Sequence, residues 1–306
     1  MFNKIFVKRY CFFVILLTRL FLFCYTVCEV ILMKLGIING WEEGHFRAVK
    51  EKGLEAVEFC INYYNDSKEV LDRAQEIKGY SEKYGILVGS IGRWGMDRID
   101  ENGNVIPEAL QHDKNLIDLA SIVGCPVYNV GCNEVEGKTY YENCLIAIDY
   151  FKVLIDYARE RNVKIATYNC DWANFVFEEK AWSVIHGALP ELGIKYDPSH
   201  CFNRGGDYLK ELRDWGSRVY HFHVKGVLHI AGEGFDDPPA GLDSLNWGAI
   251  MTMLYVNDYN GVLSIEPHSS HWKGAKGQWG VDFTIGFMKK FIMPENYEAS
   301  ADPYMP

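Results

Sequence analysis

The stretch "EKYGILVGS", residues 82–90, contains the unit from which the fold can be predicted. A charged segment with helical character reaches Gly85, a residue type that commonly ends helices, and a short apolar run follows at once. The stretch "EKGLEAVEF", residues 51–59, repeats this arrangement. The repetition indicates a chain that alternates helices with short buried strands.

The apolar runs recur from Met33 onward. They lie near residues 34–39, 56–61, 86–92, 126–131, 163–169, 193–197, 219–225 and 261–267. Near-continuous apolar strands are typical of parallel sheets that are covered on both faces. The intervening segments have helical periodicity, as in 67–85, where Ser67 is the expected N-cap and Gly85 the expected C-cap.

About eight strand–helix units in succession predict an α/β fold, a (β/α)8 TIM barrel that forms a single domain over residues 33–295. A doubly wound open sheet is the main alternative. That fold usually carries a glycine-rich nucleotide loop after its first strand, whereas "NGWEEG" at 39–44 has no G-x-G-x-x-G pattern. The tail, residues 296–306, is expected to be a loose terminus.

Residues 1–32 allow two interpretations. A basic start and a long apolar stretch resemble a signal peptide or a membrane anchor. However, Arg19 interrupts the apolar run, no small-residue cleavage site follows, and "MKLGIING" at 33–40 resembles the natural start of a cytosolic enzyme. We therefore expect an over-extended start and a cytoplasmic protein, with a membrane-anchored or exported form as the alternative.

Composition narrows the class of partner. The formal net charge is −10, from 31 basic and 41 acidic residues, which argues against nucleic acid as the main partner. The nine cysteines include no Cys-x-x-Cys pair, so neither a zinc knuckle nor a disulfide framework is indicated. A homo-oligomer remains possible.

Polar residues gather where the predicted strands end. Glu58 belongs to the second strand, Arg93 and Trp94 follow the third, Asn169 ends the fifth, Asp197 and His200 follow the sixth, His221, His223 and Lys225 belong to the seventh, and Glu266 and His268 follow the eighth. The carboxyl ends of the strands carry the active site in TIM barrels. Two carboxylates and an imidazole from different strands suit a divalent ion, because buried charges must be paired or hold a cation.

Each of these residues also has a purely structural interpretation. Histidines in strands can be satisfied core residues, and Asp197 before Pro198 can cap a helix or begin a turn. Glu58 can pair with a neighbouring basic residue. Three tryptophans are candidate stacking walls for a sugar ring, or core residues, namely Trp94, Trp172 and Trp247. The concentration of polar residues after strands six to eight favours a site.

Four motifs together resemble the sugar phosphate isomerase/epimerase superfamily, the xylose isomerase-like TIM barrels. They are "YDPSH" at 196–200, "HFHVKG" at 221–226, "PPAGLDSLNWGAI" at 238–250 and "GVLSIEPH" at 261–268, and the resemblance covers about 34–293. It implies a metal held by residues at the ends of strands five to eight, three of which correspond to Asp197, His223 and Glu266. Mn²⁺ is the expected metal, with Mg²⁺, Co²⁺ or Zn²⁺ as alternatives. His200 corresponds to a histidine that contacts substrate.

The chain departs from this family at strand five. The family typically has Leu-Glu-Asn there, whereas "IATYNC" at 165–170 has Tyr168 at the position of the glutamate and retains Asn169. That glutamate is usually both a metal ligand and an acid/base group. Its replacement implies an altered metal shell or a different mechanism. Glu58 could compensate, or the correspondence could be displaced toward Asp171.

The resemblance implies a metal-dependent isomerase or epimerase of a sugar, sugar phosphate or keto-sugar that abstracts a proton next to a carbonyl through an enediolate. The expected partner is a small sugar or polyol. Expected catalytic residues are Glu266, His200 and Tyr168, and expected substrate-binding residues are Arg93, Trp94, Asn169, Lys225 and His268. One alternative is a keto-sugar or inositol lyase or dehydratase, which needs a single base. Another is a degenerate barrel that binds a sugar without catalysis.

Overall fold

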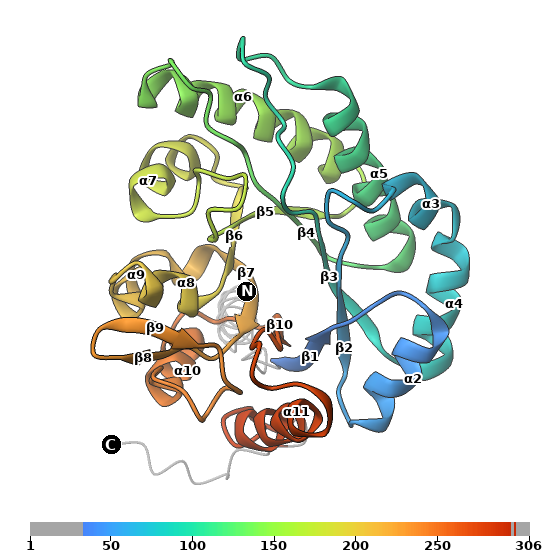
Figure 1. Cartoon of the computed structure of the whole chain (residues 1–306). Helices are drawn as coiled ribbons and strands as arrows, with labels where there is room; N and C mark the ends of the chain where they lie inside the picture. Colours follow the sequence, from blue (N-terminus) through green and yellow to red (C-terminus); the bar gives the residue numbers. More distant parts are fainter. Residues whose placement is uncertain (1–32, 295–296, 298–306) are drawn as a thin grey trace, which may run out of the picture. The chain divides into compact units, whose positions relative to one another are not determined.

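Eight parallel strands close into a barrel in the computed structural model, which describes residues 33–294 and residue 297 (Figure 1). The strands are β1 (Lys34–Ile38), β2 (Ala56–Cys60), β3 (Leu87–Gly92), β4 (Val127–Val130), β5 (Lys164–Tyr168), β6 (Gly193–Tyr196), β7 (Val219–Val224) and β10 (Val262–Ile265). They follow one another in chain order around the barrel, and β1 pairs with β10 to close it. The predicted (β/α)8 TIM barrel is confirmed.

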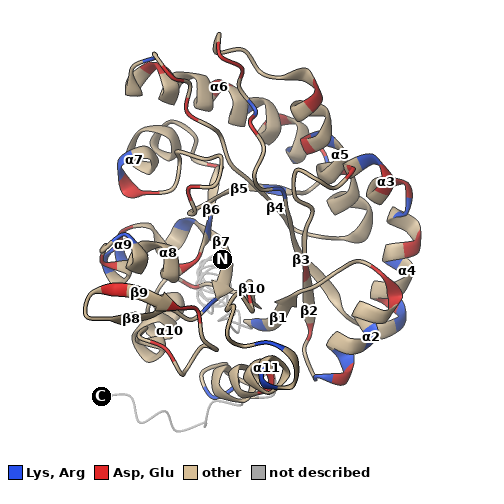
Figure 2. Cartoon of the chain, in the orientation of Figure 1, with Lys and Arg blue, Asp and Glu red and all other residues tan. Residues whose placement is uncertain are grey.

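Helices surround the strands (Figure 1). They are α2 (Glu43–Glu51), α3 (Ser67–Asp72), α4 (Ala74–Tyr84), α5 (Pro107–Val123), α6 (Tyr140–Arg159), α7 (Glu179–Ala188), α8 (Pro198–Asn203), α9 (Tyr208–Trp215), the 3₁₀ turn η1 (Gly216–Arg218), α10 (Trp247–Val256) and α11 (Gly274–Met288). Acidic and basic residues both occur along outer helices such as α2, α4 and α9 (Figure 2).

The helix predicted over 67–85 differs from the observed structure in two respects. It is broken at Arg73, whose φ of −95° and ψ of 8° separate α3 from α4. Its N-cap is Asp66, which accepts a hydrogen bond from the Lys68 backbone N–H at 2.8 Å. The hydroxyl of Ser67 instead contacts His112 Nδ1 at 2.7 Å. Gly85 ends the second helix as predicted, with a positive φ of 63°.

A hairpin that the sequence analysis did not predict follows β7. It consists of β8 (Leu228–Ile230) and β9 (Glu233–Asp236), which pair antiparallel. Its two-residue turn places Ala231 at φ 54° and Gly232 at φ 88°, the positive values that tight hairpins need. Alanine rarely adopts such a conformation, which explains why the turn was hard to recognise.

Strand alternation directs the polar side chains into the barrel. On β2, Phe59 packs edge-on against Phe46 of α2, with ring centroids 6.1 Å apart, so the neighbouring Glu58 faces the interior. On β7, Phe222 lies against Tyr196 outside, and His221 and His223 therefore face inward. The same rule turns Lys195 of β6 inward, because its register partner is His221.

Residues 1–32, for which two interpretations were open, lie outside the described residues, as does the predicted tail except for residue 297. Within the described part of the chain, no helix combines the length and apolar character needed to cross a membrane. The six cysteines described there are all free thiols.

Candidate metal and substrate site

A chain of buried hydrogen bonds links β2 to β7 inside the barrel. Glu58 Oε2 lies 2.7 Å from His221 Nε2 and 2.9 Å from His223 Nε2. The two histidines therefore face the same side of β7. Burial opposes ionisation of Glu58, but the two imidazoles outweigh it and hold the pKa of this carboxyl well below its usual range. Glu58 is therefore an ionised carboxylate that holds both imidazole rings in place by hydrogen bonds.

His223 connects this carboxylate to the end of β10. Its Nδ1 lies 2.7 Å from Glu266 Oε2, while its Nε2 faces Glu58. Burial lowers the pKa of His223, but the neighbouring carboxylates raise it to a net value above the ordinary one. With both nitrogens protonated, the ring donates to two acids. Loss of one proton frees one nitrogen as a metal ligand, while the other keeps its hydrogen bond.

The two carboxylate oxygens of Asp197 have different surroundings. Oδ1 accepts a hydrogen bond from the Ser199 backbone N–H at 2.9 Å and caps α8, as one interpretation of the sequence predicted. Oδ2 is fully buried and accepts no hydrogen bond. The nearest nitrogens are the ammonium Nζ of Lys225 and the imidazole Nε2 of His200, each 3.4 Å away. A buried carboxylate oxygen without a donor needs an explanation, and a cation supplies one.

Charges around Asp197 favour its ionised form. Burial opposes ionisation, but Lys225 and His200 outweigh it and lower the pKa of Asp197 far below the ordinary value. Glu266 behaves in the same way, because Lys225 and the hydrogen bond from His223 overcome the effect of burial and depress its pKa. Burial lowers the pKa of His200 to about 4, so at neutral pH its ring accepts from Lys225 Nζ at 3.4 Å.

The donor set fits a divalent metal ion. Asp197, His223 and Glu266 each offer one ligand atom, and these atoms lie within 4.8 Å of one another. Glu58, His221 and His223 form a second group of the same kind, deeper in the barrel. Carboxylate oxygens with one imidazole suit Mn²⁺, Mg²⁺, Co²⁺ or Zn²⁺. His223 belongs to both groups, so Glu58 can act as its orienting carboxylate.

A cavity of about 320 Å³ is lined by two of these residues, His223 and Glu266. This volume lies in the range of ligand pockets. Its lining consists of Ile38, Cys60, Asn62, Trp94, Cys170, Asp171, Trp172, Lys195, His200, His223, Lys225, Glu266 and His268. The ring of Trp94 lies in the space that a side chain at Gly92 would occupy, 2.2 Å from the position of a Cβ. Gly92 therefore allows this ring to form part of the wall.

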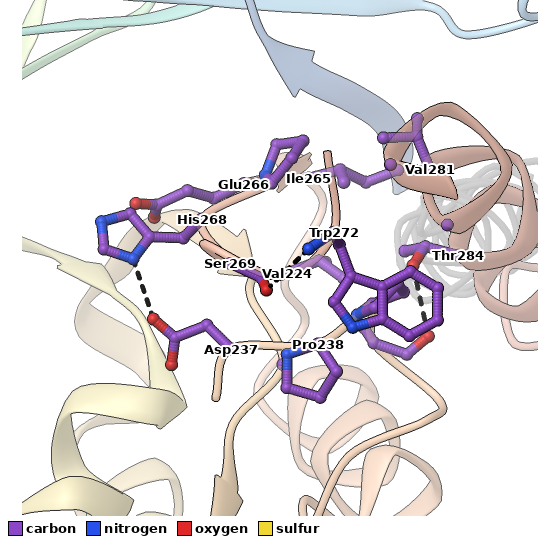
Figure 3. Close-up of a pocket in the computed structure, with 16 residues that line it drawn as sticks. Val224, Asp237, Pro238, Ile265, Glu266, His268, Ser269, Trp272, Val281 and Thr284 are labelled. Carbon is purple, nitrogen blue, oxygen red and sulfur yellow. Dashed lines mark hydrogen bonds and ion pairs between the residues drawn. The ribbon is translucent and has the colours of Figure 1, made fainter. Parts of the chain in front are cut away.

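A smaller cavity of about 30 Å³ lies behind Glu266, between β10, residues 237–240 and α11. Figure 3 shows His268 and Asp237 at one side of it, joined by a hydrogen bond of 2.8 Å, and Trp272 and Thr284 at the other. It has room for about one water molecule and none for a sugar. The two cavities share Glu266 and His268, and only the larger one suits a substrate.

Several residues expected at the site have other contacts. Arg93 donates to the backbone carbonyls of residues 61–63 and 65 and holds the loop after β2. The amide of Asn169 is used by the backbone N–H and C=O of Asp197, each at 2.9 Å. Trp247 is buried on α10 and donates to Asp243. Trp94 and Trp172, by contrast, do line the larger cavity.

Tyr168, at the position of the expected glutamate, is buried outside the cavity lining. Its ring stacks on Trp94 with centroids 5.3 Å apart, and its hydroxyl donates to the backbone carbonyl of Trp172 at 3.0 Å. That hydroxyl also lies against Gly131, where a Cβ would come within 2.4 Å. Burial raises the pKa of Tyr168 far above the ordinary value. In this arrangement the phenol anchors the loop after β5.

Sequence reasoning missed one charged residue of the cavity, Lys195. It is only 2% exposed and lines the cavity wall. A signal was present, because "GIKYD" at 193–197 places a lysine in the middle of an otherwise apolar strand. Asp171, mentioned as an alternative to the missing glutamate, also lines the cavity and is exposed.

Comparisons with known proteins agree with this fold. The family model described as xylose isomerase-like TIM barrel matches residues 46–290. No curated protein matches the chain. Among solved structures, 3-keto-D-glucoside 4-epimerase from E. coli is 16% identical with a TM-score of 0.66, covering 84% of this chain and 99% of the other. Mannonate dehydratase from Streptococcus suis is 12% identical (TM-score 0.67; 85% and 93% covered). The IOLI protein with a binding zinc atom is 16% identical (TM-score 0.68; 85% and 98% covered).

Proposed function

This chain belongs to the family of xylose isomerase-like TIM barrels, and from that premise we propose that it is a divalent-metal-dependent enzyme that moves a proton next to the carbonyl of a sugar or keto-sugar. The observation that carries the proposal is the buried Asp197 Oδ2, which has no hydrogen-bond donor and lies in one group with His223 and Glu266. These three residues would hold the ion. The zinc atom in the IOLI structure is consistent with a metal in this family, and Mn²⁺ remains our first expectation.

The chain's own groups supply the proton transfer. A divalent ion at this site would stabilise negative charge that develops on the substrate oxygens. Glu266 is the proposed base, because it lines the cavity and is held ionised by Lys225 and His223. Glu58 holds the His223 ring in place at 2.9 Å, and Trp94 and Trp172 form part of the cavity wall.

A single carboxylate base favours isomerisation over epimerisation. Epimerisation by two bases needs an acid/base group on each face of the substrate, and Tyr168 replaces the glutamate that would supply the second. Its hydroxyl is used by the Trp172 carbonyl. Isomerisation between adjacent carbons needs one base that carries the proton from one carbon to the next. We therefore place an aldose–ketose isomerase ahead of an epimerase, although the E. coli neighbour is a 4-epimerase.

A lyase or dehydratase is the second candidate. Elimination of water needs a base and a proton donor for the leaving hydroxyl, and Lys225 with His200 at 3.4 Å offers such a donor on the cavity wall. The dehydratase from Streptococcus suis has the same fold. This candidate differs from isomerisation in its product, which loses one water molecule.

The test measures metal content and proton exchange on the purified chain. We expect about one Mn, Zn, Co or Mg ion per chain by elemental analysis, and solvent deuterium at the carbon next to the carbonyl when keto-sugars are incubated in D₂O. Glu266→Gln should abolish the exchange. Asp149→Ala, which removes an exposed carboxylate on α6, is the control and should change neither result. A chain that binds no metal after dialysis against Mn²⁺ would contradict the proposal.

A further inference from the structure

Lys195 is a buried lysine that forms no ion pair among the residues that the structure describes. Its side chain projects from β6 into the barrel and lines the cavity, and the residue is 2% exposed. Among the residues that the structure describes, no carboxylate lies within ion-pair distance of its ammonium group, whereas Lys225 has Asp197 at 3.4 Å. The contact found for Lys195 is the ring of Trp94, whose centroid is 6.0 Å from Nζ.

Such a lysine is costly unless something binds to it. Removing an ammonium ion from water is strongly unfavourable, and a single cation–π contact with a centroid 6.0 Å away offsets only a small part of that cost. A lysine that only filled space would be better replaced by an apolar residue. The missing partner must therefore enter through the cavity, which is where the side chain is accessible.

The charges around the cavity indicate the sign of that partner. Asp197 and Glu266 carry two negative charges, and a divalent ion held between them would neutralise both. Glu58 then offsets one of the two ammonium groups, Lys195 and Lys225, with the histidines neutral. Among the buried groups one positive charge remains, and Lys195 is the cation without a carboxylate in ion-pair distance; Asp171 also lines the cavity, but it is exposed and its charge is screened by water. An anionic ligand is therefore favoured over a neutral sugar.

We propose that Lys195 binds a carboxylate carried by the substrate, so that the substrate is a sugar acid or related hydroxy acid; this inference rests on the function proposed above. A carboxylate is favoured over a phosphate because phosphate sites usually combine several donors, such as arginines or helix N-termini. No arginine belongs to the lining of this cavity among the described residues. Of the two ammonium groups in the lining, Lys225 already has Asp197 at 3.4 Å, which leaves that of Lys195 for one carboxylate.

The experiment compares two ligands that differ only at one end. D-gluconate carries a carboxylate where D-glucitol carries a hydroxymethyl group. Both are titrated calorimetrically into the wild-type chain, Lys195→Met and Lys195→Arg, each with chelator and with Mn²⁺. Lys68→Met, which removes an exposed lysine of α3, controls for net charge.

We expect the wild-type chain to prefer gluconate, and Lys195→Met to weaken gluconate binding at least tenfold while glucitol binding stays within twofold. Lys195→Arg should retain part of the preference, and Lys68→Met all of it. If Lys195→Met does not fold, the other two variants test the proposal. It is supported if Lys195→Arg changes the preference for gluconate while Lys68→Met leaves that preference unchanged. Wild-type protein without a gluconate preference overturns it.

Two further results would also overturn the proposal. Equal weakening of both ligands by Lys195→Met would mean that Lys195 only shapes the cavity. Unchanged gluconate binding with loss of deuterium exchange would assign Lys195 to the oxyanion formed during reaction. Failure of the proposed metal chemistry is separable, because a preference for gluconate that persists in chelator and depends on Lys195 does not require the metal.

Discussion

Two groups of buried charged residues can be compared within the part of the chain that the structure describes, and the second of them adjoins a cavity. The first surrounds Asp113 of α5, whose oxygens accept hydrogen bonds from the hydroxyls of Tyr128 and Tyr150, with Arg98 Nη2 3.4 Å away. Burial and the Asp113 charge raise the pKa of both phenols far above the usual value, so they remain donors. The second surrounds Asp197, where one oxygen has no donor.

This difference distinguishes a carboxylate that is buried for stability from one that is buried at a functional site. Both aspartates are fully buried, so burial alone does not distinguish them. At Asp113 the protein itself supplies donors to both oxygens, and nothing further is needed. At Asp197 it supplies a donor to one oxygen, and a cavity adjoins the group. An acceptor that the fold leaves unpaired is the feature that points to a ligand.

The largest loss of stability is expected from a substitution in the group around Asp113. Asp113→Ala removes the carboxylate and leaves the Arg98 guanidinium buried without its counter-charge, which typically costs about 3–5 kcal/mol of unfolding free energy. Urea denaturation measures this loss. Asp149→Ala, an exposed aspartate of α6, is the matched control and should stay within about 0.5 kcal/mol. An equally small effect at Asp113 would remove the basis of the comparison.

At Asp197 we expect a large loss of metal affinity and a smaller loss of stability. Asp197→Asn keeps an oxygen that can cap α8 but removes the charge of the proposed ligand, so metal affinity should fall at least about 100-fold, beyond the loss typical of an outer carboxylate. The unfolding free energy of the metal-free protein should fall by less than it does in Asp113→Ala, because Asn keeps the helix cap and Glu266 still offsets part of the Lys225 charge. Metal titration and urea denaturation on the same sample measure both. A stability loss as large as that of Asp113→Ala would make Asp197 structural.

A smaller effect on metal affinity is expected at Glu58, which contacts the proposed ligand His223. Glu58→Gln keeps the size of the side chain but weakens the bracing of His223, and second-layer carboxylates of this kind typically contribute 10–100-fold to metal affinity. Competition against a chromogenic chelator measures the change. The same substitution tests the deeper group, Glu58, His221 and His223, as the metal site. If that group holds the ion instead, Glu58→Gln should weaken binding more than Asp197→Asn.

The sequence predicted the barrel because strand runs and helix periodicity are local signals. All eight strands lie within a residue or two of their predicted positions. It also placed Asp197, His223 and Glu266 at the same end, since parallel strands bring their carboxyl ends together. Side-chain direction in the loops was not predictable. Arg93 follows a strand, as a substrate-binding residue would, yet its guanidinium turns toward backbone carbonyls of another loop.

The smallest effect is expected at Tyr168, which shares features of both groups. It stands beside the cavity, but its hydroxyl is paired with the Trp172 carbonyl, as the Asp113 oxygens are paired with phenols. Tyr168→Phe should therefore cost about 1 kcal/mol of unfolding free energy, the usual contribution of one hydrogen bond, and leave turnover within about twofold. Deuterium exchange and urea denaturation check the two parts. Loss of exchange with unchanged stability would instead make Tyr168 a catalytic residue, as the sequence analysis expected. Whether a buried polar atom has a hydrogen-bond partner would then no longer distinguish structural residues from functional ones in this barrel.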